Sequence, residues 1–122
     1  MQHYDIIFKK RKYEIMIICI VGPTGVGKTK LSVELAKKYN AIIINCDAMQ
    51  VYKNLDIGTA KVREDEKDGV PHYLFDIKEV WEEYSIFDYQ NDCRKLIDDI
   101  TNRGKNVIIV GGTGLYIKSA LY

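Results

Sequence analysis

The stretch VGPTGVGKTKLS at residues 21–32 constrains the fold of this chain more than any other feature. It follows the β-branched run IMIICIV at residues 15–21, which is typical of a strand buried on both faces of a parallel sheet. It leads into residues 29–39, where Leu31, Leu35 and Ala36 share one helical face and two lysines lie near the end. A glycine-rich turn between a buried strand and a helix predicts an α/β protein with a parallel sheet.

The glycines, the lysine and the threonine of this stretch have the spacing G-x-x-x-x-G-K-[ST] of a phosphate-binding loop, in the strand-to-helix context that such a loop requires. Glycines let the backbone curl so that successive N–H groups point inward, and the helix N-terminus adds partial positive charge. Lys28 adds a full charge at the terminal phosphates, and the Thr29 hydroxyl is suited to bind Mg²⁺. A turn that only joins strand to helix would not need the Lys-Thr pair. We therefore expect a phosphate-binding loop made of Gly22, Pro23, Thr24, Gly25, Val26, Gly27, Lys28 and Thr29.

Further strands and helices follow in alternation. The apolar runs at residues 41–44 and 107–110 predict two more buried strands. Ser85 and Asp88 form a capping-box pattern ahead of apolar residues at helical spacing, and Gly104 ends that helix. Residues 47–84 indicate loops with short elements, and residues 115–122 the start of another helix. We expect a three-layer α/β/α P-loop domain with a parallel sheet over residues 16–122.

The amino-acid composition limits the number of domains, the cellular compartment and the kinds of partner that are expected. With 122 residues and 47% hydrophobic residues, one domain with a core is expected, and a formal net charge of +1 gives no global excess of positive charge for nucleic acid. Three scattered cysteines indicate buried thiols in a reducing, cytoplasmic setting. The apolar runs are far shorter than the roughly 20 residues of a membrane span, so no membrane partner is expected.

The first 15 residues precede the predicted core. Their apolar residues come before a basic cluster at residues 9–12, which is the reverse of a secretory signal. Met16 stands directly before the first core strand. We expect Met16 to be the natural start and residues 1–15 to be a leader that is disordered or not native.

An acidic residue distinguishes the possible reactions. A GTPase or motor usually places an Asp for Mg²⁺ at the end of a hydrophobic strand, whereas the strand at residues 107–110 runs into Gly111, Gly112 and Thr113. Asp47 instead follows the strand at residues 41–44, where it is placed to take a proton from an incoming nucleophile. The alternative role is a cap for a helix at residues 48–52, and both roles are compatible. A small-molecule or nucleotide kinase could also place an Asp in this way.

Five blocks together carry a resemblance to a known family. They are GPTGVGKT at 22–29, DAMQVYKNLDIGTAK at 47–61, GVPHYLFDI at 69–77, YSIFDY at 84–89 and VGGTGLYIKSAL at 110–121. In this order they resemble the N-terminal part of the tRNA dimethylallyltransferases, also called the tRNA isopentenyltransferase or IPP transferase family, and the second block is specific to it. The resemblance implies transfer of a dimethylallyl group from its diphosphate to the exocyclic amine of the adenosine on the 3′ side of the anticodon, with Mg²⁺ as cofactor.

The resemblance also implies roles for individual residues. The phosphate-binding loop would hold dimethylallyl diphosphate, and Lys28 would stabilise the departing charge. Asp47 would be the base, and Thr113 would lie close to the reacting atoms and touch the tRNA, although it could instead cap the following helix. The amide of Gln50 suits a purine edge. The residues expected to contact the tRNA anticodon loop are Asp47, Ala48, Met49, Gln50 and Thr113.

Other residues are expected to be structural. Tyr52 should pack against its own domain, His72 should bind no metal, and the aromatic residues of YSIFDY should pack on a helix. Members of the family continue for more than this length again, through a helical tRNA-binding insert, so we expect this chain to stop before that insert and the full-length protein to be a monomer. Two alternatives to the transferase stay open, a P-loop kinase and a phosphate-binding fragment without activity.

Overall fold

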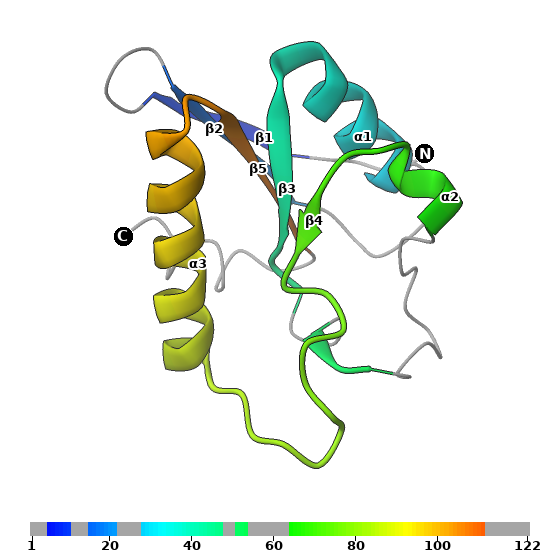
Figure 1. Ribbon diagram of the computed structural model, residues 1–122, viewed down its shortest axis with the longest axis vertical. Coiled ribbons are helices and arrows are strands. Elements are labelled where there is room, and N and C mark those ends of the chain that lie inside the picture. The colour runs from blue at the N-terminus through cyan, green and yellow to red at the C-terminus, as the bar shows by residue number, and fades with distance from the viewer. Residues whose placement is uncertain (1–4, 11–14, 22–27, 48–50, 54–63, 112–122) are drawn as a thin grey trace.

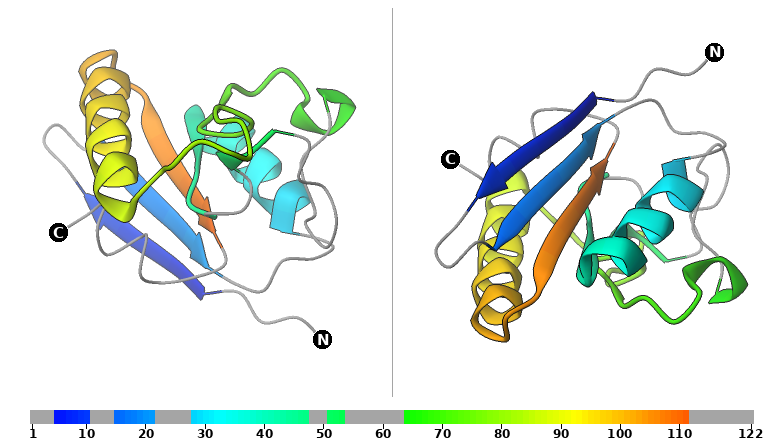
Figure 2. Two further views of the ribbon diagram at one scale, coloured as in Figure 1. Left: turned by 90° about the horizontal axis from the view of Figure 1, so that it is seen from below. Right: turned by 90° about the horizontal axis from the view of Figure 1, so that it is seen from above.

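The computed structural model describes residues 5–10, 15–21, 28–47, 51–53 and 64–111. Five strands form one sheet in the order β1-β2-β5-β3-β4 (Figure 1). The strands are β1 (Asp5–Lys10), β2 (Met16–Val21), β3 (Ala41–Asn45), β4 (His72–Tyr73) and β5 (Asn106–Gly111). The helices are α1 (Lys28–Tyr39), α2 (Glu64–Lys67) and α3 (Ile86–Asn102). Helices α1 and α3 cover opposite faces of the sheet, which gives three layers (Figure 2).

The centre of the sheet is parallel. Strand β5 lies between β2 and β3 and is parallel to both, so that Ile108 pairs with Ile18 on one side and with Ile43 on the other. Strand β4 continues the parallel arrangement beyond β3. The predicted α/β/α fold with a parallel sheet is therefore confirmed. The elements that were predicted with bounds, β2, α1, β3, α3 and β5, agree with those bounds to within about one or two residues, the normal uncertainty of such boundaries, whereas β1, α2 and β4 had no predicted bounds.

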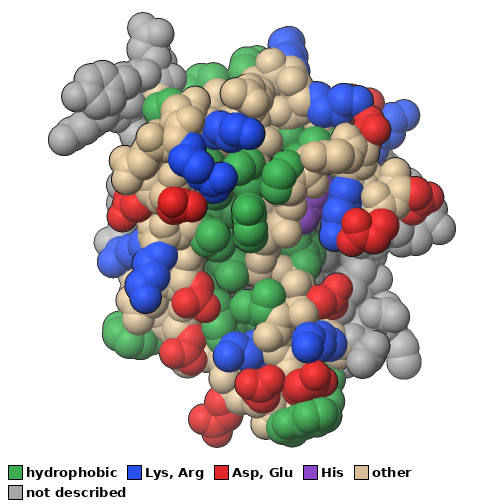
Figure 3. Space-filling model, in the orientation of Figure 1, with side chains coloured by type: hydrophobic (Ala, Val, Ile, Leu, Met, Phe, Trp, Pro, Cys, Tyr) green, Lys and Arg blue, Asp and Glu red, His purple; other side chains and the backbone are tan. Residues whose placement is uncertain are grey.

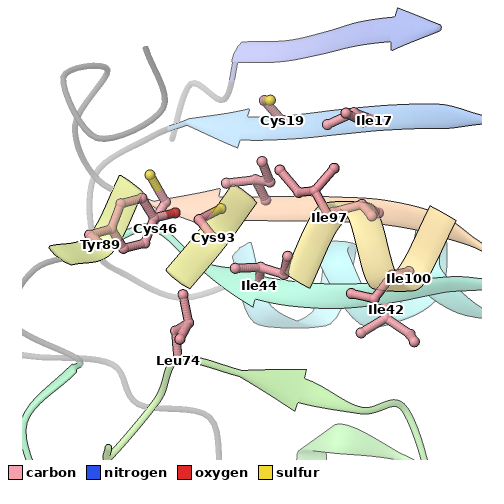
Figure 4. Packing of buried hydrophobic residues seen from close by; sticks show 12 residues of the cluster. Ile17, Cys19, Ile42, Ile44, Cys46, Leu74, Tyr89, Cys93, Ile97 and Ile100 are labelled. Atoms are coloured by element: carbon pink, nitrogen blue, oxygen red, sulfur yellow. The ribbon is translucent and has the colours of Figure 1, made fainter. Parts of the chain in front are cut away.

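Each strand of the centre is buried on both faces, which explains its uninterrupted apolar sequence. On one face Ile17 and Ile44 pack with residues of α3, including Tyr89 and Ile97 (Figure 4). On the other face Ile18, Ile20 and Ile43 pack with Val33 and Ala36 of α1. The three cysteines form no disulfide and are buried, as predicted, and they lie in the cluster between α3 and the sheet.

Helix α3 begins at the predicted capping box. The Ser85 Oγ accepts a hydrogen bond from the Asp88 N–H at 3.1 Å, and the Asp88 carboxylate accepts one from the Ser85 N–H at 2.9 Å. The helix ends before Gly104, which adopts a φ of +77°. One expectation is wrong here, because Phe87 is 64% exposed instead of packed. It lies in the first turn, on the side of α3 away from the sheet, whereas Tyr89 faces the sheet and is buried.

Strand β1 corrects the expectation for the leader. Residues 5–10 are not disordered: they pair antiparallel with the whole of β2, from Asp5 opposite Val21 to Lys10 opposite Met16. The physical reason is that β2 would otherwise expose a row of unpaired backbone groups along its outer side, and an extended segment nearby in sequence can satisfy them. The natural start at Met16 stays a prediction.

Candidate functional site

The predicted site segments begin at one edge of the sheet, where the parallel strands β2, β5 and β3 end. Val21 pairs with Gly111, and the Cys46 N–H donates to the Val110 carbonyl at 2.7 Å, so the three strand ends lie side by side. In an open parallel sheet covered on both faces, ligands bind outside these carboxyl ends. Asp47 follows β3 at this edge. The other predicted site residues here lie outside the described residues: Gly22, Pro23, Thr24, Gly25, Val26, Gly27, Ala48, Met49, Gln50 and Thr113.

Helix α1 presents its N-terminus at the same edge. It starts at Lys28, directly after the phosphate-loop stretch, and runs for 12 residues. Its first turn contains no acidic residue. The unsatisfied N–H groups and the dipole of such a terminus favour an anion, and the absence of carboxylates there removes the charge that would oppose one.

Thr29 is the predicted Mg²⁺ ligand and lies half-buried in the first turn of α1. Its carbonyl accepts a hydrogen bond from the Ser32 hydroxyl at 2.8 Å. Within the described ranges, no group of three or more His, Cys, Asp or Glu side chains is arranged to hold a metal ion. Mg²⁺ commonly keeps several waters and binds through one or two protein groups plus substrate phosphates, and a single threonine hydroxyl fits that arrangement.

A groove of about 450 Å³ lies between α1 and α2, and its side chains do not suit a diphosphate. It is lined by Thr29, Lys30, Val33, Glu34, Lys37, Asp65, Glu66 and Asp68. Four of these residues are acidic and two are basic, and Lys37 already forms an ion pair with Asp68. The groove shares Thr29 and Lys30 with the first turn of α1, but its net negative charge disfavours an anion within it.

Asp47, the predicted base, is held by a residue that the sequence analysis missed. The Asn45 side chain is 1% exposed, and its Oδ1 accepts a hydrogen bond from the Asp47 N–H at 2.8 Å. Its Nδ2 donates to the carbonyls of Asp47 and Leu74, both at 2.9 Å. The available signal was a polar residue directly after four apolar ones in a buried strand. The alternative role of Asp47 as a helix cap concerns residues 48–52, of which 48–50 lie outside the described residues; Tyr52 forms a β-bridge with Lys78.

Gly111 is a second residue to which the sequence analysis gave no role. A Cβ built on Gly111 would lie 2.7 Å from the Cys46 Cβ, 2.7 Å from the Cys46 carbonyl oxygen and 2.8 Å from its carbonyl carbon. Real Cβ atoms do not approach other atoms this closely. Only glycine at position 111 therefore lets the end of β5 lie this close to Cys46, the residue that directly precedes Asp47.

The segment after the predicted tRNA-contacting residues is also anchored. The N–H groups of Ile77 and Lys78 donate to the Val51 carbonyl at 2.8 and 3.1 Å, and the Lys53 N–H donates to the Lys78 carbonyl at 2.8 Å. Tyr52, bridged to Lys78 and half-buried, agrees with its expected packing within the domain. Residues 48–50 are thus flanked by two fixed points.

Burial disfavours the charged forms of His72, Cys46 and Cys93. The His72 ring N–H donates from Nδ1 to the Val70 carbonyl at 2.8 Å, and burial lowers the pKa of His72, which agrees with a structural role. Burial raises the pKa of the Cys93 thiol to about 11 and also raises the pKa of Cys46. These thiols, which lie next to Tyr89, are neutral at physiological pH and fill space in place of acting as nucleophiles (Figure 4).

The described part of the chain has no helix that is both long and apolar enough to cross a membrane. The fold and the site together define an α/β protein with a parallel sheet. A phosphate-loop sequence begins where β2 ends, and a carboxylate, Asp47, follows β3, which lies two strands from β2 in the sheet. The family model described as IPP transferase matches residues 50–122, more than half of the chain. The chain belongs to the IPP transferase family.

Known relatives agree with this membership. The tRNA dimethylallyltransferases of Enterococcus faecalis and Anoxybacillus flavithermus are 62% and 59% identical over 106 residues, which is 87% of this chain and 34% of each relative. The solved tRNA isopentenylpyrophosphate transferase of Bacillus halodurans has a TM-score of 0.80 and 51% identity over 86% of this chain and 34% of its own. A eukaryotic dimethylallyltransferase acting on tRNA has a TM-score of 0.78 and 44% identity, over 84% of this chain and 25% of its own.

The chain thus spans about a third of the length of the bacterial relatives it matches. These matches give no support to the kinase alternative.

Proposed function

We propose that this chain forms the donor-binding and catalytic part of a tRNA dimethylallyltransferase. The observation that supports the proposal is the convergence of three strand ends, by which Val21, after which the phosphate-loop stretch follows in the sequence, Gly111 and Asp47 lie at one edge of the sheet. The substrates are dimethylallyl diphosphate and the adenosine on the 3′ side of a tRNA anticodon. The product is the adenosine with a dimethylallyl group on its exocyclic nitrogen.

In the reaction, the bond between the allylic carbon and the diphosphate oxygen breaks, and its electron pair leaves with the diphosphate. Because that group gains charge, its stabilisation lowers the barrier. The N-terminus of α1, the backbone N–H groups of Gly22 and residues 24–27, and Lys28 serve this purpose in our proposal. Mg²⁺, held by the diphosphate oxygens and Thr29, would supply further neutralisation of the leaving group.

The nucleophile needs a base. The exocyclic amine of adenine is a weak nucleophile because its lone pair is delocalised into the ring, so its proton must leave as the carbon–nitrogen bond forms. The Asp47 carboxylate accepts this proton in our proposal. Ala48, Met49, Gln50 and Thr113 would contact the unpaired base, which an anticodon loop can present outside a duplex.

A longer protein would supply most of the tRNA surface. The net charge of this chain is +1, and acidic and basic side chains are interspersed on the face drawn in Figure 3. Neutralisation of several tRNA phosphates requires clustered Lys and Arg side chains. In our proposal that basic surface lies in the part of the full-length protein that corresponds to the two thirds of the relatives not matched by this chain. A full-length protein containing this chain would act as a cytoplasmic monomer without a membrane partner.

Calorimetric titration of this chain with dimethylallyl diphosphate and with pyrophosphate, with and without Mg²⁺, tests the donor site. We expect Mg²⁺-dependent binding that Lys28→Ala abolishes. Lys30→Ala is the matched control, because Lys30 lies two residues further along α1, is exposed, and should leave binding unchanged. Phosphoryl transfer from ATP without affinity for the prenyl donor would instead favour the kinase.

A further inference from the structure

We propose that Asn45 is a positioning residue for Asp47: its buried side-chain amide fixes the backbone of Asp47 and ties it to Leu74. This inference rests on the proposed function, because it assumes that Asp47 accepts the amine proton. Asn45 touches no substrate in this proposal. It acts through the residue two positions later.

The hydrogen bonds of Asn45 bind both backbone polar groups of Asp47. The side-chain oxygen accepts from the Asp47 N–H at 2.8 Å, and the side-chain nitrogen donates to the Asp47 carbonyl at 2.9 Å. The backbone of Asn45 is itself paired with Val110 in the ladder between β3 and β5. These hydrogen bonds therefore fix the backbone position of Asp47 relative to the sheet. Through β5 they also fix it relative to the end of β2, where the phosphate-loop stretch begins.

The third bond connects Asp47 to a distant segment. The Asn45 nitrogen also donates to the carbonyl of Leu74, 29 residues away, at 2.9 Å. Leu74 has a φ of +65°, a conformation that a leucine adopts only when its surroundings impose it. Its side chain is buried in the cluster beneath α3, so the carbonyl that meets Asn45 is rigidly placed. Asp47 is thereby held from two directions.

The chemistry of this position requires a side-chain amide. A serine could accept a hydrogen bond from the Asp47 N–H, but its hydroxyl has a single proton and cannot donate to two carbonyls at once. An aspartate could accept but not donate, and it would add a negative charge two residues from Asp47. A fully buried amide that uses its oxygen and both hydrogens is also costly to disrupt, because each partner would be left unsatisfied.

Asn106 provides a matched control. Its side chain makes the same kind of bridge, accepting from the Met16 N–H at 2.8 Å and donating to the Tyr39 carbonyl at 2.6 Å. It lies at the start of β5, at the opposite edge of the sheet from Asp47. Replacement of either asparagine removes a side-chain bridge, which is buried at Asn45 and partly buried at Asn106, but only replacement of Asn45 releases the candidate base.

The test compares Asn45→Ala, Asn106→Ala and Asp47→Asn in a full-length protein that contains this chain. Both alanine variants should lower the melting temperature. Only Asn45→Ala should reduce the single-turnover transfer rate per folded molecule, by roughly tenfold to a hundredfold, the effect of a misplacement of about 1 Å. It should also accelerate hydrogen exchange of the Asp47 amide, while donor affinity stays within about twofold of the parent because the phosphate loop is untouched.

The outcomes separate the two proposals. If Asp47→Asn transfers at the normal rate, the base assignment falls whatever Asn45 does. If Asp47→Asn is slow but Asn45→Ala transfers as fast as Asn106→Ala, Asn45 is only structural and the positioning proposal is overturned. Should Asn45→Ala fail to fold, Asn45→Ser, which keeps an acceptor for the Asp47 N–H but cannot span to Leu74, gives the same comparison.

Discussion

Replacement of Gly111 by alanine tests the geometry at the base of the site. The added Cβ would meet the Cβ and the carbonyl oxygen of Cys46 at 2.7 Å and its carbonyl carbon at 2.8 Å. Two of these three atoms belong to the backbone, so no side-chain rotation relieves the contact. Strand β5 must move away from the end of β3, directly beside Asp47.

The size of the effect follows from these distances. Carbon atoms pack best at about 3.5–4.0 Å, so the strands must separate by roughly 0.8 Å or more at this point. Overpacking of a buried site costs about 1–3 kcal/mol. Alanine also restricts the unfolded chain, which offsets about 0.4–1 kcal/mol of that loss. We expect the free energy of unfolding to fall by about 1–2 kcal/mol.

Urea denaturation followed by circular dichroism measures this loss. Gly104→Ala serves as the comparison, because a Cβ there meets nothing within 4 Å and its cost arises only from the φ of +77°. Asparagine tolerates that conformation, so Gly104→Asn should recover stability, whereas Gly111→Asn should be worse than Gly111→Ala.

The same displacement should affect the site. A shift of this size beside Asp47 should accelerate exchange of the Asp47 amide and slow transfer in a full-length protein, while Gly104→Ala should do neither. A Gly111→Ala protein with unfolding free energy within about 0.5 kcal/mol of the parent, the range of ordinary surface substitutions, would refute the argument from close packing.

Three further predictions concern the base, the thiols and the helix cap. In a full-length protein, Asp47→Asn should slow transfer by roughly 10²–10⁴-fold with little change in donor affinity, whereas a near-normal rate would leave Asp47 as a helix cap, because Asn and Asp cap about equally well. Because burial raises the pKa of Cys93 from 9.0 to about 11, the stability that this thiol contributes is complete below pH 9 and is lost as the pH rises towards 11. The loss is on the order of 1–3 kcal/mol, and urea titrations at pH 8 and 10.5 should show a smaller pH-dependence in Cys93→Ala; an equal dependence in both proteins would contradict the assignment. Ser85→Ala should lower the unfolding free energy by about 1 kcal/mol, since it removes the capping bond to Asp88, while Ser85→Thr should stay close to the parent; equal stability of all three would show that the cap contributes nothing.

The sequence by itself determined the local elements. The continuous β-branched runs predicted β2, β3 and β5, because burial on both faces leaves no polar side in a strand. The pattern at Ser85 and Asp88 predicted the start of α3, because a capping box is made within four residues. The motif ending in Lys28 and Thr29 predicted the start of α1 for the same reason: backbone conformation and side-chain bonds over a few residues are encoded locally.

Only the tertiary structure decided which strand ends meet. Nothing local to β5 specifies that it lies between β2 and β3, since parallel pairing joins segments far apart in the chain. The need for Gly111 appears only once β5 passes Cys46, and the role of Asn45 only once Leu74 comes within hydrogen-bond distance. The pairing of residues 5–10 was likewise settled by the open side of β2. Contacts of this kind depend on the arrangement of the whole sheet, so a sequence pattern that spans a few residues cannot contain them.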